Sequence, residues 1–177
     1  DRIPNAGIIY SKDHGKTWNI STLARTNTTE SQVAEVEPGV LMLNMRDNRG
    51  GSRAVSTTTD LGKTWKEHES SRTALQEPVC MASLISVKAK ENVLGKDILL
   101  FSNPNDAKNR HSITIKASLD GGVTWLPENQ LLLDAGWGWG YSCLTMIDKE
   151  TVGILYESSV AHMTFQAIKL KDIIKTK

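Results

Sequence analysis

One eight-residue pattern constrains this sequence more than any other feature, because it occurs three times, at residues 11–18, 58–65 and 118–125. Each copy reads S/T-x-D-x-G-x-T-W. In such a segment the Asp carboxylate can accept hydrogen bonds from turn amides, the Gly can adopt a positive φ, and the Ser and Thr hydroxyls can brace the ends. We predict three compact hairpin turns, each with its Trp packed beneath. The aspartates then serve folding rather than catalysis: Asp13, Asp60 and Asp120.

The spacing of the three copies predicts a repeated sheet unit. Asp13 and Asp60 are 47 residues apart, and Asp60 and Asp120 are 60 residues apart. These lengths match a propeller blade of about four strands. A strand-like run precedes each turn, and helical periodicity is almost absent. The chain holds only about three to four blades' worth of strands, too few to close a ring. We therefore expect an all-β chain that is part of a larger protein.

Alternation of apolar and polar residues predicts the remaining strands. Residues 81–87 and 97–102 are expected to be strands, and the polar stretches 88–96 and 103–110 are expected to be loops. The closing stretch alternates over 163–170 and continues into 171–174. We predict a last strand there.

The composition is that of an ordinary globular domain. The 177 residues are 39% hydrophobic and 23% charged, with a formal net charge of +1, so nothing indicates nucleic acid as a partner. No apolar run approaches the ~18 residues that cross a bilayer. Residues 1–4 fit neither a signal peptide nor an initiator-methionine context, so we expect an internal or processed start. Cys80 and Cys143 lie in apolar runs without metal-ligand spacing, which predicts buried free thiols.

Two further hairpins carry ionisable residues at their open ends. The first turns at Pro38 and would place Glu30 across from Arg46, with Cβ atoms about 4.5–5.5 Å apart. The second would place Tyr141 across from Glu157. In both hairpins the end residues lie 16 positions apart in the sequence. Ionisable groups would thus gather where a sheet meets solvent, which is a place where a site can form.

With these motifs in this order, the sequence resembles the C-terminal half of sialidases (neuraminidases), most of all those of gut bacteria such as Bacteroides. The resemblance covers nearly the whole chain, and the segments that carry it are the three turns, known as Asp boxes, and residues 30–36, 43–46, 110, 140–142 and 155–157. It implies a six-bladed β-propeller, of which residues 1–177 supply roughly the C-terminal half. It also implies a retaining exo-glycosidase that hydrolyses terminal α-linked sialic acid without a metal or other cofactor.

The same resemblance implies a role for each residue at the hairpin ends. Tyr141 would be the nucleophile, and Glu30 would be the base that activates it. Arg46 and Arg110 would bind the sugar carboxylate, and Glu157 would hold a remaining arginine in place. The chemistry supports these choices, because the carboxylate at the anomeric carbon of sialic acid does not repel a neutral phenol. A planar guanidinium binds such a carboxylate bidentately.

Two parts of a sialidase site are expected outside these residues. The first arginine of the family lies in an Arg-Ile-Pro motif, and an acid/base aspartate follows it. Arg2 stands in the same three-residue sequence, but the first Asp box follows too closely to leave room for that aspartate. We therefore predict that both groups lie upstream and that this chain alone does not turn over substrate.

Alternatives remain at two places in the expected site. Arg49 and Arg53 lie close to Arg46 in the sequence, and the spacing from Glu30 favours Arg46, with Arg53 as a support on the next strand. The second place is the pair Trp137 and Trp139, whose indoles either form a surface on which the sugar rests or pack against the loop.

The expected partners of such a protein are sialylated glycans, glycoproteins or glycolipids, together with the remaining blades of the same propeller. We expect the protein to be secreted, periplasmic or attached to the cell surface. The competing function is a non-catalytic Asp-box propeller that binds glycan or protein. That alternative explains the three turns, but it gives no reason to combine Tyr141, Glu30 and Arg46 with Arg110 and Glu157.

Overall fold

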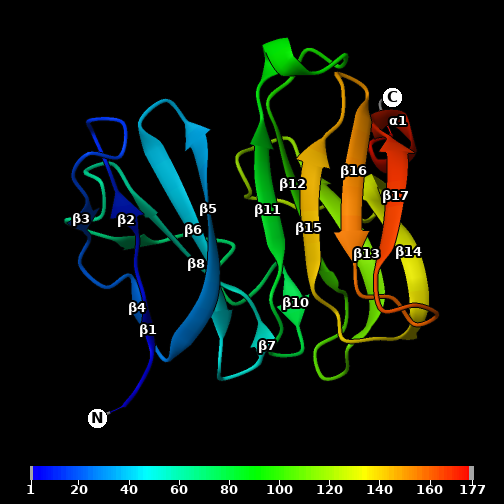
Figure 1. Cartoon of the computed structure of the whole chain (residues 1–177), viewed down its shortest axis with the longest axis horizontal. Helices are drawn as coiled ribbons and strands as arrows, with labels where there is room; N and C mark the ends of the chain where they lie inside the picture. The colour runs from blue at the N-terminus through cyan, green and yellow to red at the C-terminus, as the bar shows by residue number, and fades with distance from the viewer. Residues whose placement is uncertain (1, 176–177) are drawn as a thin grey trace.

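The computed structural model of this protein describes residues 2–175, and it consists almost wholly of antiparallel β-sheet. The sheets stand side by side in chain order, from the N-terminal strands on the left of Figure 1 to the C-terminal sheet on the right. Strand β11 lies between β5 and β15, so the first strands of three successive sheets are neighbours. This is the arrangement of adjacent propeller blades.

The N-terminal part of the chain contains two small two-stranded sheets, together called the first sheet below, and a four-stranded second sheet. At the N-terminal edge, β1 (Asn5–Ala6) pairs with β4 (Arg25–Thr26), and β2 (Ile9–Tyr10) pairs with β3 (Asn19–Ile20). The second sheet has the order β5 (Thr28–Glu37), β6 (Val40–Asp47), β8 (Ala54–Thr58) and β9 (Lys66–Glu67). Beside it, β7 (Gly51–Ser52) pairs with β10 (Gln76–Glu77).

The third and fourth sheets complete the described chain. The third has the order β11 (Ser83–Val87), β12 (Ile98–Pro104), β13 (His111–Ser118) and β14 (Gln130–Trp137). The fourth has the order β15 (Ser142–Met146), β16 (Thr151–Tyr156) and β17 (Thr164–Lys169). Within residues 2–175, three short helices connect or follow these strands: η1 (Ala89–Glu91), η2 (Pro127–Asn129) and α1 (Leu170–Ile173). The all-β prediction is therefore confirmed.

Hydrophobic clusters fill the spaces between neighbouring sheets. Met42, Leu84 and Phe101 belong to the cluster between the second and third sheets. Ile115 and Ile154 belong to the cluster between the third and fourth sheets. Full burial of side chains of this size contributes about 1.5–3 kcal/mol each. The sheets are therefore held face to face, which fixes the relative positions of the loops at their ends.

Each Asp box forms the predicted turn and joins two paired strands. In the second copy Asp60 Oδ1 accepts hydrogen bonds from the Thr58 hydroxyl at 2.8 Å and from the Thr64 amide at 3.0 Å. Hydrogen bonds from the backbone and side chain of Thr64 hold the pKa of Asp60 at about 2, and hydrogen bonds from Thr17 hold the pKa of Asp13 at about 2. The aspartates are thus engaged within their own turns.

The packing of the Asp-box tryptophans differs between the copies. Trp125 is buried against Phe101, with ring centroids 5.8 Å apart, as predicted. Trp18 is 62% exposed, so the prediction is wrong for the first copy. The reason is that, within residues 2–175, no second sheet covers the small β2–β3 sheet on that side.

Two other predictions fail at the C-terminal sheet. Residues 171–174 were expected to form a strand, but α1 replaces it, because a helical turn brings both Leu170 and Ile173 into the core at 0% exposure. Cys143 was expected to be buried, but it is exposed, because burial alternates along β15 and Cys143 lies on the exposed face of the strand. Cys80 is buried, and both cysteines are free.

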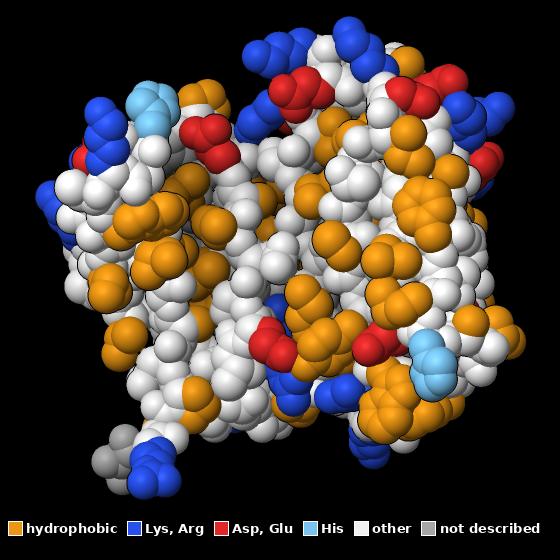
Figure 2. All heavy atoms as spheres, viewed as in Figure 1, with side chains coloured by type: hydrophobic (Ala, Val, Ile, Leu, Met, Phe, Trp, Pro, Cys, Tyr) orange, Lys and Arg blue, Asp and Glu red, His pale blue; other side chains and the backbone are white. Residues whose placement is uncertain are grey.

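The two edges of the array expose apolar surface. Ile9 and Ile20 are 67% and 82% exposed at one edge, and Leu155 and Phe165 are 41% and 60% exposed at the other. Figure 2 shows hydrophobic side chains spread over the C-terminal sheet. The sheets are arranged as propeller blades but do not close into a ring, so residues 2–175 make up only part of a β-propeller. Between residues 2 and 175 there is no helix long and apolar enough to cross a membrane.

Candidate active site

Four side chains from four different segments meet at one end of the sheets. Glu30 lies near the start of β5 and Arg46 near the end of β6. Tyr141 directly precedes β15, and Arg110 directly precedes β13. Acidic, basic and hydrophobic side chains gather in the lower middle of Figure 2, at the same end of the molecule.

The first hairpin brings Glu30 and Arg46 together, as the sequence predicts. The strand pairing runs regularly from Ser31 with Met45 toward the turn, but it is irregular between Thr28 and Ser31. Glu30 falls in this irregular stretch, so the two residues are not a regular ladder pair. Their side chains still meet, because Arg46 Nη1 donates to Glu30 Oε2 at 2.6 Å.

The Tyr141 hydroxyl completes the contact between the two hairpins. It donates a hydrogen bond to Glu30 Oε1 and accepts one from Arg46 Nη1 at 3.3 Å. The Arg110 guanidinium lies over the Tyr141 ring, with its central carbon 5.9 Å from the ring centroid. All four side chains therefore lie within one polar cluster, which we call the Tyr141 cluster: Glu30, Arg46, Arg110 and Tyr141.

The second hairpin positions Tyr141 through its backbone. Glu157 Oε2 accepts a hydrogen bond from the Tyr141 amide at 3.0 Å, and the Glu157 amide donates to the Tyr141 carbonyl at 2.9 Å. Gly140 has φ +89°, and a Cβ at this position would lie 2.7 Å from Pro104 Cγ. A glycine is therefore required directly before Tyr141. Among residues 2–175 Glu157 makes no ion pair with an arginine, so its role as an arginine support stays a prediction.

The protonation states in the cluster follow from these contacts. Burial alone would raise the pKa of Glu30, but hydrogen bonds from Tyr141 and Arg46, together with the charges of Arg46 and Arg110, hold it below its ordinary value. The hydrogen bond to Glu30 raises the pKa of Tyr141, with further contributions from burial and from the Glu30 charge. At neutral pH the site therefore holds a carboxylate beside a neutral phenol. This is the arrangement that a base and its proton donor require.

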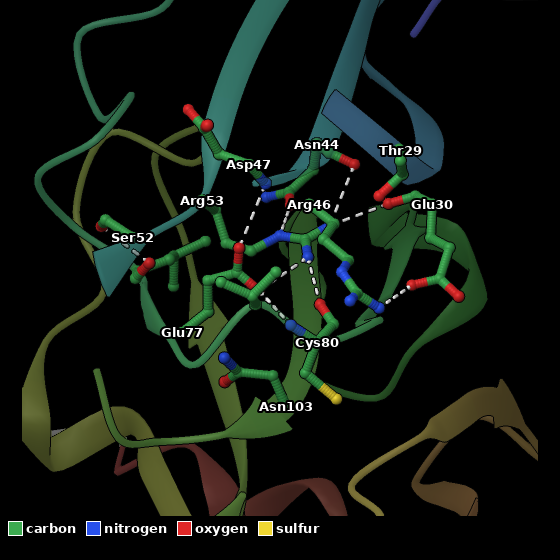
Figure 3. A network of polar contacts seen from close by, with 12 residues as sticks. Thr29, Glu30, Asn44, Arg46, Asp47, Ser52, Arg53, Glu77, Cys80 and Asn103 are labelled. Carbon is green, nitrogen blue, oxygen red and sulfur yellow. Dashed lines mark hydrogen bonds and ion pairs between the residues drawn. The ribbon is translucent and has the colours of Figure 1, made fainter. Parts of the chain in front are cut away.

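A second arginine–glutamate pair lies beneath the cluster and is fully buried. Arg53 Nη1 lies 3.2 Å from Glu77 Oε2, and both side chains are 0% exposed. Arg53 Nε donates to Asn44 Oδ1 at 2.7 Å, and Arg53 Nη2 donates to the Glu30 carbonyl at 3.4 Å. Figure 3 shows Arg53 between Asn44, Glu77 and Cys80, while the side chain of Arg46 points toward Glu30. The buried pair thus supports the strand from which Glu30 projects.

The buried pair also fixes the segment that holds Arg110. Glu77 Oε2 accepts from the Cys80 amide at 2.9 Å, and Arg53 Nη1 donates to the Cys80 carbonyl at 2.7 Å. Between them Val79 has φ 52°, which is a rare conformation for a β-branched residue and persists only where the surroundings impose it. The Val79 carbonyl accepts a hydrogen bond from Arg110 Nη2 at 3.2 Å. The strained turn therefore anchors the guanidinium.

Cys80 lies under the cluster without taking part in an ion pair. Burial raises the pKa of its thiol to about 11, against the opposing charges of Arg110 and Arg46. Its Sγ lies 3.7 Å from the Trp139 carbonyl. The thiol is therefore neutral at physiological pH and packs against the Trp139 backbone.

The competing arginines lie outside the cluster. Arg49 pairs with Asp47 at 3.0 Å, and Arg2 is exposed near the N-terminus, at the edge of the array far from β15. Arg53 lies directly before β8 as a buried support, in keeping with its expected role. Sequence reasoning missed Glu77 as the partner of Arg53. The available signal was an acidic residue directly before the apolar run of residues 78–82.

The described residues include no group of three or more His, Cys, Asp or Glu side chains that could hold a metal ion.

The fold is that of an Asp-box β-propeller, because Asp-box turns join the strands of sheets that lie side by side. A polar cluster lies at the end of the first strands of these sheets. The cluster, with its tyrosine, carboxylate and arginines, lies at one end of the sheets.

Comparisons with known proteins identify the family of this propeller. Residues 2–154 match the family described as BNR repeat-like domain. A sialidase of Bacteroides fragilis is 80% identical over 174 residues, which is 98% of this chain and 32% of that protein. The solved structure of Hadza microbial sialidase Hz136 matches with a TM-score of 0.95 and 74% identity, over 98% of this chain and 34% of that one.

A more distant structure agrees in fold alone. It is Trypanosoma rangeli sialidase in complex with 2,3-difluorosialic acid, described as a covalent intermediate, with a TM-score of 0.72 and 22% identity over 93% of this chain and 26% of that one.

The family match and the Bacteroides fragilis relative show that the chain belongs to the BNR repeat-like family and, within it, to the sialidases. It spans about a third of the length of the Bacteroides fragilis relative. The resemblance to sialidases stated from the sequence is confirmed, and the assignment of the chain to the C-terminal half of the propeller stays a prediction.

Proposed function

We propose that the complete protein that carries this chain hydrolyses terminal α-linked sialic acid from glycans, glycoproteins or glycolipids, with Tyr141 as the nucleophile. The observation that carries this proposal is the hydrogen bond from the Tyr141 hydroxyl to Glu30, in a cluster that also contains Arg46 and Arg110. The family membership supports the substrate class, and the cluster supports the assignment of roles.

The first step would be attack by the phenol on the anomeric carbon. The Tyr141 oxygen forms a bond to that carbon while its proton passes to Glu30, and the glycosidic carbon–oxygen bond breaks. The leaving oxygen takes a proton from an acid, which we expect in the upstream part of the protein. A neutral phenol suits this substrate because the carboxylate at the anomeric carbon would repel an anionic nucleophile. The raised pKa of Tyr141 keeps the phenol protonated until Glu30 accepts its proton.

The two arginines would bind the substrate carboxylate. Within residues 2–175 the side-chain hydrogen bonds of Arg46 leave from Nη1, to Glu30 and Tyr141, so its Nη2 keeps its donors for a ligand. Arg110 is held from behind by the Trp139 carbonyl at 3.0 Å and the Val79 carbonyl at 3.2 Å. These contacts use only two of the five N–H donors of a guanidinium. Both arginines therefore combine a fixed position with remaining capacity for a carboxylate.

The second step would release the sugar with its original configuration. Water attacks the anomeric carbon on the face that the leaving group vacated and gives one proton to the upstream group that lost its proton in the first step. The bond to Tyr141 breaks, and Glu30 returns its proton to the phenolate. Two displacements at one carbon give net retention. Glu157 would contribute by fixing the Tyr141 backbone, in addition to its expected contact with an upstream arginine.

The test is release of sialic acid by the complete protein, followed by proton NMR to identify the first anomer formed. We expect free sialic acid from sialyllactose, with the α-anomer appearing before mutarotation. Appearance of the β-anomer first would contradict the role of Tyr141 as a nucleophile. Binding of the sialoside by a folded protein without release would instead support the non-catalytic propeller.

A further inference from the structure

We infer that Asp106 is a positioning residue for substrate binding: it closes the loop between β12 and β13 so that Arg110 is held in position to bind the substrate carboxylate, an inference that rests on the proposed function. The loop follows Pro104, the last residue of β12, and Arg110 directly precedes β13. The hydrogen bonds and the ion pair of Asp106 stay within this loop and at the first residue of β13. Its effect on the reaction therefore passes through Arg110.

The Asp106 carboxylate contacts the chain on both sides of Arg110. Its Oδ1 accepts hydrogen bonds from the Lys108 amide at 2.7 Å and the Asn109 amide at 2.6 Å, which is the pattern of an Asx turn. Its Oδ2 lies 3.5 Å from His111 Nε2. Hydrogen bonds from the Asn109 and Lys108 amides hold the pKa of Asp106 below its ordinary value, so the group is ionised at neutral pH. One carboxylate therefore fixes the backbone before Arg110 and contacts the side chain after it.

The far side of the loop ends in a β-bulge. The register of β13 with β14 shifts between His111 and Ile113, and Ser112 has φ 61°, a rare conformation for a residue other than glycine. The Ser112 carbonyl accepts a hydrogen bond from the Asn105 amide at 2.9 Å, which closes the loop at its base. A bulge adds an unpaired residue and changes the direction of its neighbours. This one therefore helps to set the direction of the chain at Arg110.

Neighbouring segments hold the two ends of the loop. Gln76 Nε2 donates to both the carbonyl and the Oδ1 of Asn105, at 3.0 Å each. The Gly138 amide donates to the Arg110 carbonyl at 2.9 Å. Asp106 supplies the constraint between these ends, because its two amide bonds hold the segment directly before Arg110.

An arginine on a fixed backbone binds a carboxylate more tightly than one on a mobile loop. A guanidinium binds a carboxylate through a planar fork, so its direction must match that of the carboxylate. Without the turn at Asp106, the loop and the long side chain of Arg110 would be ordered only when substrate binds, and that ordering weakens binding. Asp106 therefore contributes to the affinity for the substrate carboxylate without touching it.

The test compares the binding of sialic acid with that of its methyl ester, by NMR titration of the complete protein and of its Asp106→Ala variant. The ester has no carboxylate charge, so the ratio of the two dissociation constants reports on the arginines that bind the carboxylate. In Asp106→Ala we expect the dissociation constant of sialic acid to rise about 3- to 10-fold, as for weakening of one charge-assisted contact. That of the ester should stay as in the wild type. An equal rise for both compounds would overturn the inference, and so would an unchanged constant for sialic acid in the folded variant.

Two conservative variants separate the geometry of the turn from the charge of Asp106. Asp106→Asn keeps an oxygen that can accept from the Lys108 and Asn109 amides, so it should bind sialic acid as the wild type does. Asp106→Glu keeps the charge, but its longer side chain does not close the same turn, so it should bind sialic acid as weakly as Asp106→Ala. The reverse order would overturn the inference by assigning the effect to the charge. This comparison holds even if Asp106→Ala does not fold.

Asp148→Ala is the matched control, because Asp148 Oδ1 accepts from the Glu150 amide at 2.8 Å in the turn between β15 and β16, at the end of β15 opposite Tyr141. It should leave both dissociation constants as in the wild type, and a change equal to that of Asp106→Ala would overturn the inference. Binding is measured without turnover, so the two proposals fail separately. A wild type that binds sialic acid but does not release it from sialyllactose would contradict the proposed hydrolysis alone. A wild type that does not bind sialic acid would overturn both.

Discussion

The molecule contains two arginine–glutamate pairs one above the other, and they differ in what surrounds them. In the upper pair, Arg46 and Glu30 lie 2.6 Å apart with side chains 19% and 37% exposed. In the lower pair, Arg53 and Glu77 lie 3.2 Å apart and are 0% exposed. The lower pair makes its remaining contacts with the chain itself, whereas the upper pair shares its contacts with the hydroxyl of Tyr141.

This difference indicates that the upper pair takes part in the reaction, whereas the lower pair supports the fold. An exposed ion pair contributes only about 0–1 kcal/mol to stability, so the stability of the fold does not explain the upper pair. Removal of one partner of a buried pair is expensive, because it leaves an uncompensated charge inside the protein. We therefore expect substitutions in the upper pair to change turnover and substitutions in the lower pair to change stability.

The largest effect should follow the loss of the Tyr141 hydroxyl. In the complete protein, Tyr141→Phe should lower kcat on the order of 10⁴-fold, as expected for removal of a nucleophile. Unfolding should be almost unaffected, because the hydroxyl projects into the open cluster. Steady-state kinetics and thermal unfolding of the same preparation measure both. A variant with wild-type kcat would remove Tyr141 from the nucleophile role.

Glu30→Gln should come next, with kcat lower by about 10²- to 10⁴-fold as expected for loss of a general base. In the wild type, Glu30 must be ionised to accept the proton. Its pKa is held below the ordinary value of 4.5, so this group should reduce activity only as the pH falls below that value. The variant should lack this acid limb in a plot of kcat/KM against pH. An unchanged acid limb would assign it to another group.

Glu77→Gln should act on stability instead. The charge of Arg53 would remain buried without its partner, and the free energy of unfolding should fall by about 3–5 kcal/mol. Urea denaturation of the complete protein measures this change, with Glu30→Gln as the matched control at the exposed pair. If both variants lost equal stability, the distinction between the two pairs would fail.

The local features of this fold could be predicted from the sequence. Each Asp box contains its own hydrogen-bonding groups within eight residues, and each hairpin sets the register of its own ends. The pairing of Glu30 with Arg46 followed from the turn at Pro38, and the position of Tyr141 across from Glu157 followed in the same way. What joins the two hairpins, the bond between Tyr141 and Glu30, was implied only by the family resemblance.

The features that escaped prediction depend on contacts between distant segments. Arg53 and Glu77 are 24 residues apart. The Cys80 backbone joins this pair through a turn with a positive φ at Val79, which sequence patterns do not favour for a β-branched residue. Residues 171–174 fit a strand as well as a helix, and only the core position of Ile173 decides for α1. The placement of the acid/base group and the first arginine upstream stays a prediction.

The smallest effect is expected for substitution of Asp60. This solvent-accessible carboxylate serves folding, as the buried pair does, and not turnover. Its pKa is about 2 in the folded protein, lower than the ordinary 3.8. The ionised form is therefore favoured by folding, so this contribution is present above about pH 4 and is lost as the pH falls toward 2. Thermal unfolding should show Asp60→Asn to be less stable than wild type at pH 6, with the gap narrowing at pH 2.5. A constant gap would contradict this linkage.

The most direct test of the central claim is to identify the residue that bonds to the sugar. The complete protein would be incubated with 2,3-difluorosialic acid, the compound present in the Trypanosoma rangeli complex, then digested and analysed by mass spectrometry. The account predicts a sugar adduct on the peptide that contains Tyr141, and no adduct in Tyr141→Phe. An adduct on Glu30, or one that persists in Tyr141→Phe, would contradict it.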